Sequence, residues 1–139
     1  MEGPFWEAMD GRRPWPAAME TLGFELISYD AEAGAVEVAF TAPPHFGNLV
    51  GNVQGGFQAA MLDAALGSAV VCTLGEGEIA PTLELKVSYL RPAPLGRILA
   101  RARVLRRGRT VAFVAGELYD EAGTMIASAT ATQLVTRER

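Results

Sequence analysis

Residues 54–74, QGGFQAAMLDAALGSAVVCTL, decide the fold of this chain. Apart from its first residues and Asp63, the stretch is apolar on every side, and a helix without a polar face is typical of a buried helix. Burying an ionised carboxylate is costly unless the carboxylate is paired, and this helix contains no Lys or Arg. Asp63 therefore needs a partner from elsewhere in the fold, or it serves chemistry.

Composition indicates one ordinary globular domain that spans residues 1–139. Hydrophobic residues make up 50% of the chain and charged residues 20%, and 139 residues are enough for a sizeable core. The net charge of -4 predicts no strong affinity for nucleic acid or for an anionic membrane. One Cys and one His exclude a disulfide framework and argue against a zinc site, and no nucleotide or flavin motif is present, so we expect no metal and no cofactor.

The chain carries no visible targeting segment. No basic start followed by an apolar run opens it, and Gly, Gln and Asp interrupt the helix around Asp63 too often for a membrane span. We therefore expect a cytoplasmic protein. Cys72 lies in the apolar helix, where a small core residue is the better interpretation than a nucleophile.

Strand patterns flank the helix on both sides. Residues 1–22 read as a partly helical lead-in broken by prolines, and residues 41–53 form a long Gly/Pro-marked loop of a length that is usually functional. Alternating or β-rich runs predict strands at residues 24–30, 35–40, 82–90, 97–105, 110–119 and 124–135. This order predicts an α+β fold in which one antiparallel sheet wraps around one long central helix.

Gly55 and Gly56 open the helix. The first N–H groups of a helix have no internal acceptor and lie at the positive end of its dipole, and glycine lets a ligand oxygen approach them closely. These N–H groups are therefore a candidate oxyanion hole. The alternative is a tight loop-to-helix turn that needs glycine geometry.

Asp63 has mostly small neighbours on the helix, at Ala59, Ala60 and Gly67, which leaves room for a ligand or for another helix. The alternative is a structural Asp bonded to backbone or to a Thr. Gly55 and Asp63 are eight residues apart, or roughly 12 Å along a helix, so one small reacting group cannot touch both in one chain. If both act together, they come from two subunits, which predicts a homodimer with two equal sites.

Other polar residues are weaker candidates. Asn48 can donate and accept hydrogen bonds in the long loop, although a turn residue is the better interpretation from its type alone, and Thr82, at the start of a strand, can reach a carboxylate or a water. His45, the only His, is expected at the surface near a pocket mouth. Seven of the twelve basic residues fall between residues 91 and 109. A phosphorylated ligand or a solvated charged hairpin would each explain this local basic patch.

The segment from Asn48 to Asp63, NLVGNVQGGFQAAMLD, resembles the hotdog-fold acyl-CoA thioesterases of the phenylacetate-degradation (PaaI) type. Their signature is an Asn, then His-Gly-Gly six residues later, then an Asp nine residues after that His. The resemblance continues through PTLELKVSYLRPAPLG and covers most of the chain from about Leu22. Gln54 stands where the family has His; Gln keeps a donor and an acceptor but does not titrate near pH 7.

The resemblance implies hydrolysis of an acyl-CoA thioester in a homodimer or a dimer of dimers. It gives Asp63 the role of general base or nucleophile and Gly55, helped by Gly56, that of oxyanion donor. Further expected roles fall to the remaining candidates: Asn48, Gln54 and Thr82 at the reaction centre, Phe57 and Met61 in the acyl pocket, and His45, Arg91, Arg106, Arg107 and Arg109 around the CoA. The alternative is an acyl-CoA-binding or sensing protein on the same fold, or a dimeric scaffold in which Asp63 is structural.

Overall fold

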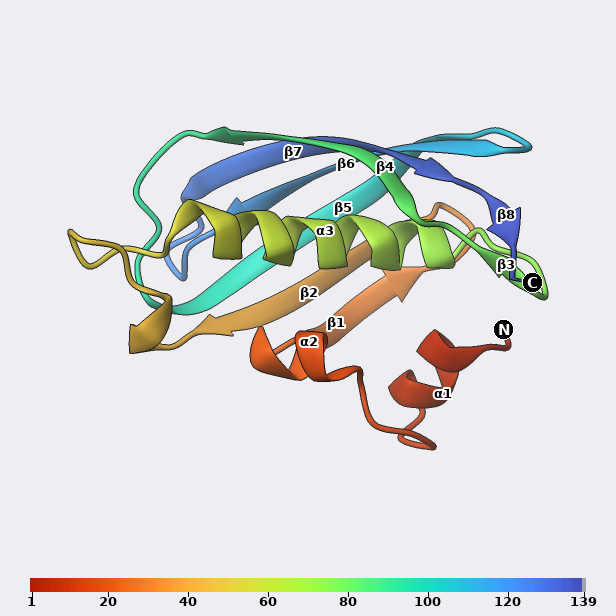
Figure 1. The fold of residues 1–139 in the computed structure, drawn as a ribbon, viewed down its shortest axis with the longest axis horizontal. Helices are drawn as coiled ribbons and strands as arrows, with labels where there is room; N and C mark the ends of the chain where they lie inside the picture. The colour runs from red at the N-terminus through yellow and green to blue at the C-terminus, as the bar shows by residue number, and fades with distance from the viewer. Residues whose placement is uncertain (139) are drawn as a thin grey trace.

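The computed structural model describes residues 1–138 and shows one long helix lying across a curved sheet (Figure 1). The six strands of the sheet are antiparallel and run in the order β1-β2-β5-β6-β7-β4, and a separate pair is formed by β3 and β8. The helices are α1 (Pro4–Met9), α2 (Ala17–Thr21), the 3-10 helix η1 (Pro44–Phe46) and α3 (Gly55–Val71). The strands are β1 (Glu25–Asp30), β2 (Ala35–Ala42), β3 (Glu78–Ile79), β4 (Thr82–Tyr89), β5 (Gly96–Arg107), β6 (Val111–Tyr119), β7 (Met125–Leu134) and β8 (Thr136–Arg137).

The α+β prediction is confirmed, and the six predicted strands are all present with bounds that differ by up to two residues. The two-residue strands β3 and β8 were not predicted, because a strand of two residues carries no alternation. The predicted helix ends earlier than expected. The Thr73 hydroxyl donates to the Val70 carbonyl at 2.7 Å and so satisfies one of the free carbonyls where α3 ends.

The core lies between α3 and the sheet. Met61, Leu62 and Leu66 of α3 are fully buried against the inner face of the strands. Gly116 of β6 allows the close approach, since a Cβ at this position would lie 2.7 Å from the Arg101 carbonyl oxygen and 3.0 Å from Leu66 Cδ2. The lack of a side chain at Gly116 therefore lets α3 pack closely against β6.

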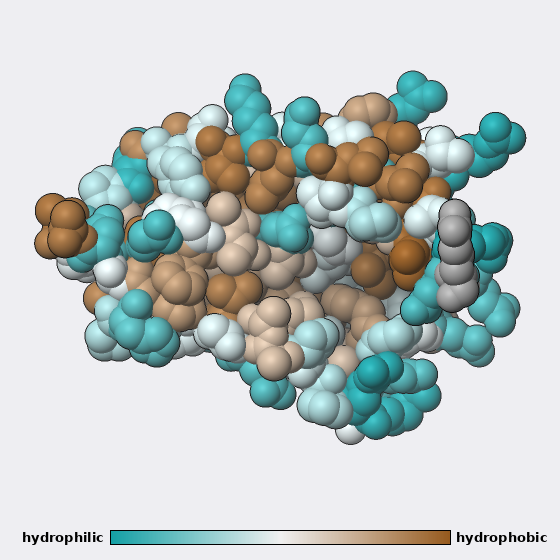
Figure 2. Space-filling model, viewed as in Figure 1, coloured by the Kyte–Doolittle hydropathy of each residue, from teal (hydrophilic) through white to brown (hydrophobic). Residues whose placement is uncertain are grey.

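The other side of α3 is open, which corrects the prediction of a helix buried on every side. Gly56 and Ala60 are exposed, and Asp63, Ala64 and Gly67 are half-buried. Figure 2 shows largely apolar surface over α3 and β4 on this face. The sheet covers one side of this all-apolar helix, and no other segment of residues 1–138 covers the opposite side.

Strand β4 is an edge of the sheet and carries exposed apolar side chains near its two ends. Leu83 keeps 60% of its surface exposed and Tyr89 50%, whereas Glu84, Lys86 and Ser88 between them are exposed polar residues. An unpaired edge strand is a template for pairing with another chain. The open face of α3 and the free edge of β4 are therefore both available for contact with a second chain.

The N-terminal lead-in covers the β1 side of the molecule through aromatic contacts. Trp6 is buried and meets Tyr29 edge to face at 5.1 Å, and Trp15 meets Phe24 at 4.9 Å. Both tryptophans therefore cover apolar surface. Within residues 1–138, no helix combines the length and the apolarity that crossing a bilayer requires.

Candidate active site

Asp63 lies in the middle of the open face of α3. Its Oδ1 accepts a hydrogen bond of 2.8 Å from the Thr82 hydroxyl at the start of β4. None of the ion pairs among residues 1–138 involves Asp63, and its Oδ2 accepts no hydrogen bond from any described residue. The predicted partner is thus a Thr, and one carboxylate oxygen stays available.

The sheet fixes the position of Thr82. Thr82 pairs with Gln133 of β7, and the Leu134 N–H donates to the Pro81 carbonyl at 2.9 Å. Directly paired residues of antiparallel strands present their side chains on one face of the sheet. Thr82 therefore points toward α3 from a rigid support, which orients the carboxylate of Asp63.

Gln54 caps the N-terminus of α3. Its Oε1 accepts from the Gly56 N–H at 2.8 Å and from the Phe57 N–H at 3.3 Å. The expectation that Gly56 helps as an oxyanion donor is therefore wrong for this structure, since that N–H is already occupied. The Gly55 N–H donates to no described residue, which leaves it as the free donor at the positive end of the helix dipole.

Tyr89 holds the first turn of α3, and sequence reasoning did not identify it. Its hydroxyl donates to the Gly55 carbonyl at 2.6 Å. A Cβ at residue 55 would lie 3.2 Å from Tyr89 Cζ, so the tyrosine ring occupies the space that a side chain would need. Residue 55 therefore favours glycine because the Tyr89 ring leaves little space for a side chain.

Asn48 organises the loop before α3. Its Oδ1 accepts from the Val50 N–H at 3.1 Å and from the Asn52 N–H at 3.0 Å, so it acts as a turn residue, while its Nδ2 meets no acceptor among the described residues. The turn presents Leu49 and Val50 to solvent with 106% and 79% exposure. Exposed apolar side chains held on a rigid turn are typical of a contact surface.

The remaining predicted pocket residues divide into surface and core. His45 is exposed on η1, with its ring edge against Phe46. Phe57 is half-buried and stacks on Phe46 with ring centroids 3.8 Å apart. Met61 is fully buried in the core, which corrects the expectation that it lines an acyl pocket.

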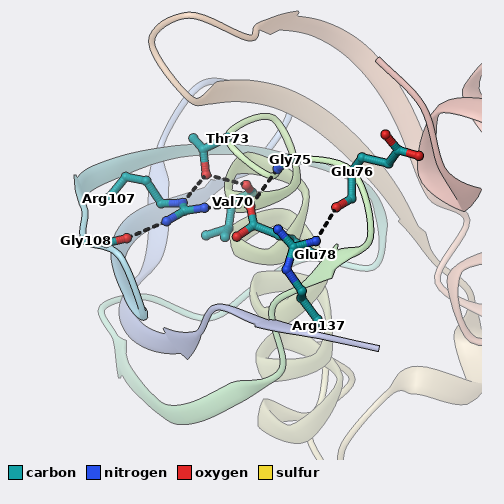
Figure 3. A network of polar contacts seen from close by, with 8 residues as sticks. All are labelled: Val70, Thr73, Gly75, Glu76, Glu78, Arg107, Gly108 and Arg137. Atoms are coloured by element: carbon teal, nitrogen blue, oxygen red, sulfur yellow. Dashed lines mark hydrogen bonds and ion pairs between the residues drawn. The ribbon is translucent and has the colours of Figure 1, made fainter. Parts of the chain in front are cut away.

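The four candidate arginines do not form one patch. Arg107 lies where α3 ends, bonded to Glu78 at 2.9 Å and to Thr73 at 3.3 Å (Figure 3). Its guanidinium therefore stabilises the turn after α3, which corrects the expectation that Arg107 contacts the CoA phosphates. Arg106 and Arg109 on the same hairpin are exposed and make no ion pair with described residues. Arg91 lies two residues after Tyr89, near the start of α3, and donates to the Met125 carbonyl at 2.9 Å.

Other chemistry has little support in the described residues. Burial raises the pKa of the Cys72 thiol, which favours the unreactive protonated form. Residues 1–138 contain no group of three His, Cys, Asp or Glu side chains that could hold a metal ion. On α3 itself, the Gly55 N–H and the Asp63 Oδ2 are free of described partners and lie about 12 Å apart along the helix at ~1.5 Å per residue.

Comparison with known proteins identifies the family and supports the fold. The model of the thioesterase superfamily matches residues 50–127. The medium/long-chain acyl-CoA thioesterase YigI of Escherichia coli K12 is 37% identical, with 82% of each chain covered. A phenylacetic acid degradation-related protein of Ralstonia eutropha JMP134 has 43% identity and a TM-score of 0.91, over 95% of this chain and 99% of that one. The protein smu.793 of Streptococcus mutans, solved bound to acetyl CoA, has 28% identity and a TM-score of 0.74, over 84% of this chain and 90% of that one. On its sequence and its fold, the chain belongs to the thioesterase superfamily.

Proposed function

We propose that this protein hydrolyses acyl-CoA thioesters at a site shared between two copies of the chain. The observation that carries the proposal is the pair of free groups on α3, a backbone donor at Gly55 and a carboxylate oxygen at Asp63. The proposed reaction needs both groups at one thioester carbonyl. Within one chain they are too far apart along α3 to reach it together. The name of YigI and the acetyl CoA bound to smu.793 support CoA thioesters as the substrate class.

Two antiparallel α3 helices around a twofold axis would bring the free groups together. With Gly55 opposite Asp63, the axis passes near Ala59 and the arrangement makes two equal sites. The exposed small residues of α3 allow the helices to approach, and the free edge of β4 lies beside them. The second half of α3 then faces the loop before α3 of the second copy, which gives the exposed Leu49 and Val50 a surface to cover.

In the proposed reaction, the Gly55 N–H binds the thioester oxygen and stabilises the negative charge that develops on it. Asp63, oriented by Thr82, accepts a proton from the water that attacks the carbonyl carbon. The carbon–sulfur bond then breaks, so the products are the free acid and the CoA thiol. Asp63 as nucleophile, with an anhydride that water then cleaves, is the second route that the same geometry allows.

Groups around this centre complete the proposal. The free Nδ2 of Asn48 would donate to the carbonyl or to the leaving group, and His45 lies at the surface beside the same loop. Arg91 near the start of α3 and the exposed Arg106 and Arg109 remain candidates for the CoA phosphates.

The test is the release of free CoA thiol from a panel of acyl-CoA esters by the wild type and by Asp63→Asn. The substitution keeps the shape of the side chain and removes the proton acceptor, so we expect kcat to fall by at least about a thousandfold. Asp10→Asn, an exposed position in a surface ion pair, is the matched control and should keep full activity. Full activity of Asp63→Asn would contradict the proposed reaction, and tight binding of acyl-CoA without release by the wild type would favour the sensing alternative.

A further inference from the structure

We propose that the acyl chain of the substrate runs along the open face of α3 and ends in a cavity that α1 forms with the end of α3. This inference rests on the proposed function, because it starts from a thioester carbon held beside Asp63. It assigns to the N-terminal lead-in a role in setting the length of the acyl chain.

The cavity has a volume of about 310 Å³, near the lower end of the ~300–1,000 Å³ typical of ligand sites. Its apolar lining comes from three segments that are far apart in the sequence: Phe5 and Trp6 of α1, Val71 and Leu74 at the end of α3, and Ile79 and Ala80 before β4. The lining also includes Glu2, Glu78 and Glu138, and the apolar part of the cavity suits a hydrocarbon tail.

Two walls of the cavity continue directly to the reaction centre. Val71, the last residue of α3, follows Asp63 by eight residues, which places it within about a quarter turn of the same helix face at 3.6 residues per turn, and Leu74 follows in the turn after the helix. On the other wall, Ala80 precedes Thr82 by two residues. Thr82 and Asp63 are hydrogen bonded to each other, so both walls start at the reaction centre, and in the proposed path a chain that follows the open face of α3 toward the end of the helix enters this cavity.

Gly67 leaves the path clear. It lies one turn beyond Asp63 on the half-buried face, and a Cβ at this position would meet nothing closer than Gln133 Nε2 at 4.0 Å. Ala64 beside it is also small. In the proposed dimer, the loop with Leu49 and Val50 of the second copy would lie over this segment and form the roof of the path.

A network of polar contacts fixes the far wall (Figure 3). Glu78 binds the Arg107 guanidinium at 2.9 Å and accepts from the Gly75 N–H at 2.7 Å, and Arg137 donates to the Glu76 carbonyl at 2.9 Å. The turn between α3 and β3 is thus held from two strands, and the charge of Glu78 is paired beside the cavity. A fixed wall can limit the length of an acyl chain.

The structure gives an approximate length for that chain. Val71, where α3 ends, lies about 12 Å from Asp63 along the helix axis. An extended hydrocarbon advances about 1.3 Å per carbon, from a C–C bond of ~1.52 Å, so about 9 carbons reach the cavity and the further carbons of a longer chain enter it. Straight medium-length acyl chains are therefore the substrate class that the path fits.

The experiment measures kcat/KM for straight-chain acyl-CoA esters of increasing length. For the wild type, we expect a rise of up to about fourfold per added methylene, corresponding to ~0.8 kcal/mol, until the path is full near about 12 carbons. Val71→Phe places a ring at the entrance of the cavity. The increase of kcat/KM with chain length should therefore stop near about 8 carbons, the length that reaches residue 71 at ~1.5 Å of helix per residue, and short esters should be unaffected. Ile79→Trp obstructs the opposite wall from a partly exposed position and should act in the same way if Val71→Phe folds poorly.

Ala122→Phe, in the exposed turn after β6, is the control for added bulk and should keep the wild-type profile. If the obstructing variants lower kcat/KM equally at every length, or leave the profile unchanged, the tail site is wrong and the proposed hydrolysis stands. If the wild type releases no CoA at any length, the proposed function fails and the tail site fails with it.

Discussion

Replacing Gly55 with proline would remove one backbone donor, and its ring would also add bulk beside Tyr89. Proline has no N–H, and it is well tolerated at the first position of a helix, which is the position of Gly55. Gln54, the residue before it, has φ -61° and ψ 139°, a conformation that a following proline favours. Since the Gly55 N–H donates to no described residue, its loss breaks no hydrogen bond of the fold.

The expected effect is large because the donor acts on the charge of the transition state. Loss of one oxyanion donor costs about 3 kcal/mol, so kcat/KM of Gly55→Pro should fall by about 100-fold to 1,000-fold. Gly55→Ala is the matched control: its Cβ meets the same Tyr89 ring, at 3.2 Å from Cζ, and it keeps the N–H. The difference between the two variants therefore isolates the donor from the added bulk.

The assay is CoA release at limiting substrate, with circular dichroism and the oligomeric state measured for both variants. A folded Gly55→Pro protein with the activity of Gly55→Ala would refute the assignment of Gly55 as the oxyanion donor. A loss that is equally large in Gly55→Ala would assign the effect to displacement of Tyr89.

Three further expectations follow from single contacts. Thr82→Val removes the hydrogen bond to Asp63, so kcat should fall about tenfold in the same release assay with KM little changed, and an unchanged kcat would show that Thr82 does not orient the carboxylate. Gln54→Ala removes the cap of α3, so thermal unfolding should shift down by roughly 3 °C, for a loss of about 1 kcal/mol; an unchanged Tm would argue against the cap. The pKa of Cys72 is raised by burial, so its alkylation at pH 7.5 should be slower than that of a free thiol and should accelerate above pH 9; rapid alkylation at neutral pH would contradict this burial.

Most of the fold follows from local patterns. Alternation fixed the six long strands, and the apolar stretch around Asp63 predicted α3, because both signals arise within one element. The open face of α3 could not be predicted in this way. An all-apolar helix predicts that every side of the helix is covered. It does not predict whether the same chain or a second copy covers each side.

The proposed roles of Gly55 and Asp63 come from residue type and spacing, which limit the chemistry that each residue can perform. The role of Tyr89 depends on the approach of β4 to the start of α3, a tertiary contact that no local pattern encodes. Met61 lies one helical turn after Phe57, and this spacing suggested that both line the acyl pocket. Met61 is in the core because its side of α3 is the side that packs on the sheet. Arg107 shows the same limit, since its partner Glu78 comes from a separate part of the chain.

The most direct measurement for the shared site mixes two inactive variants, Asp63→Asn and Gly55→Pro, under conditions that exchange subunits. In a mixed dimer, one of the two shared sites receives both intact residues, so random exchange should restore about a quarter of the wild-type activity. If both residues act within one chain, every site keeps one defect and the mixture stays as inactive as its components. Restored CoA release is the predicted result, and continued inactivity of a verified mixed dimer would contradict a site shared between two copies.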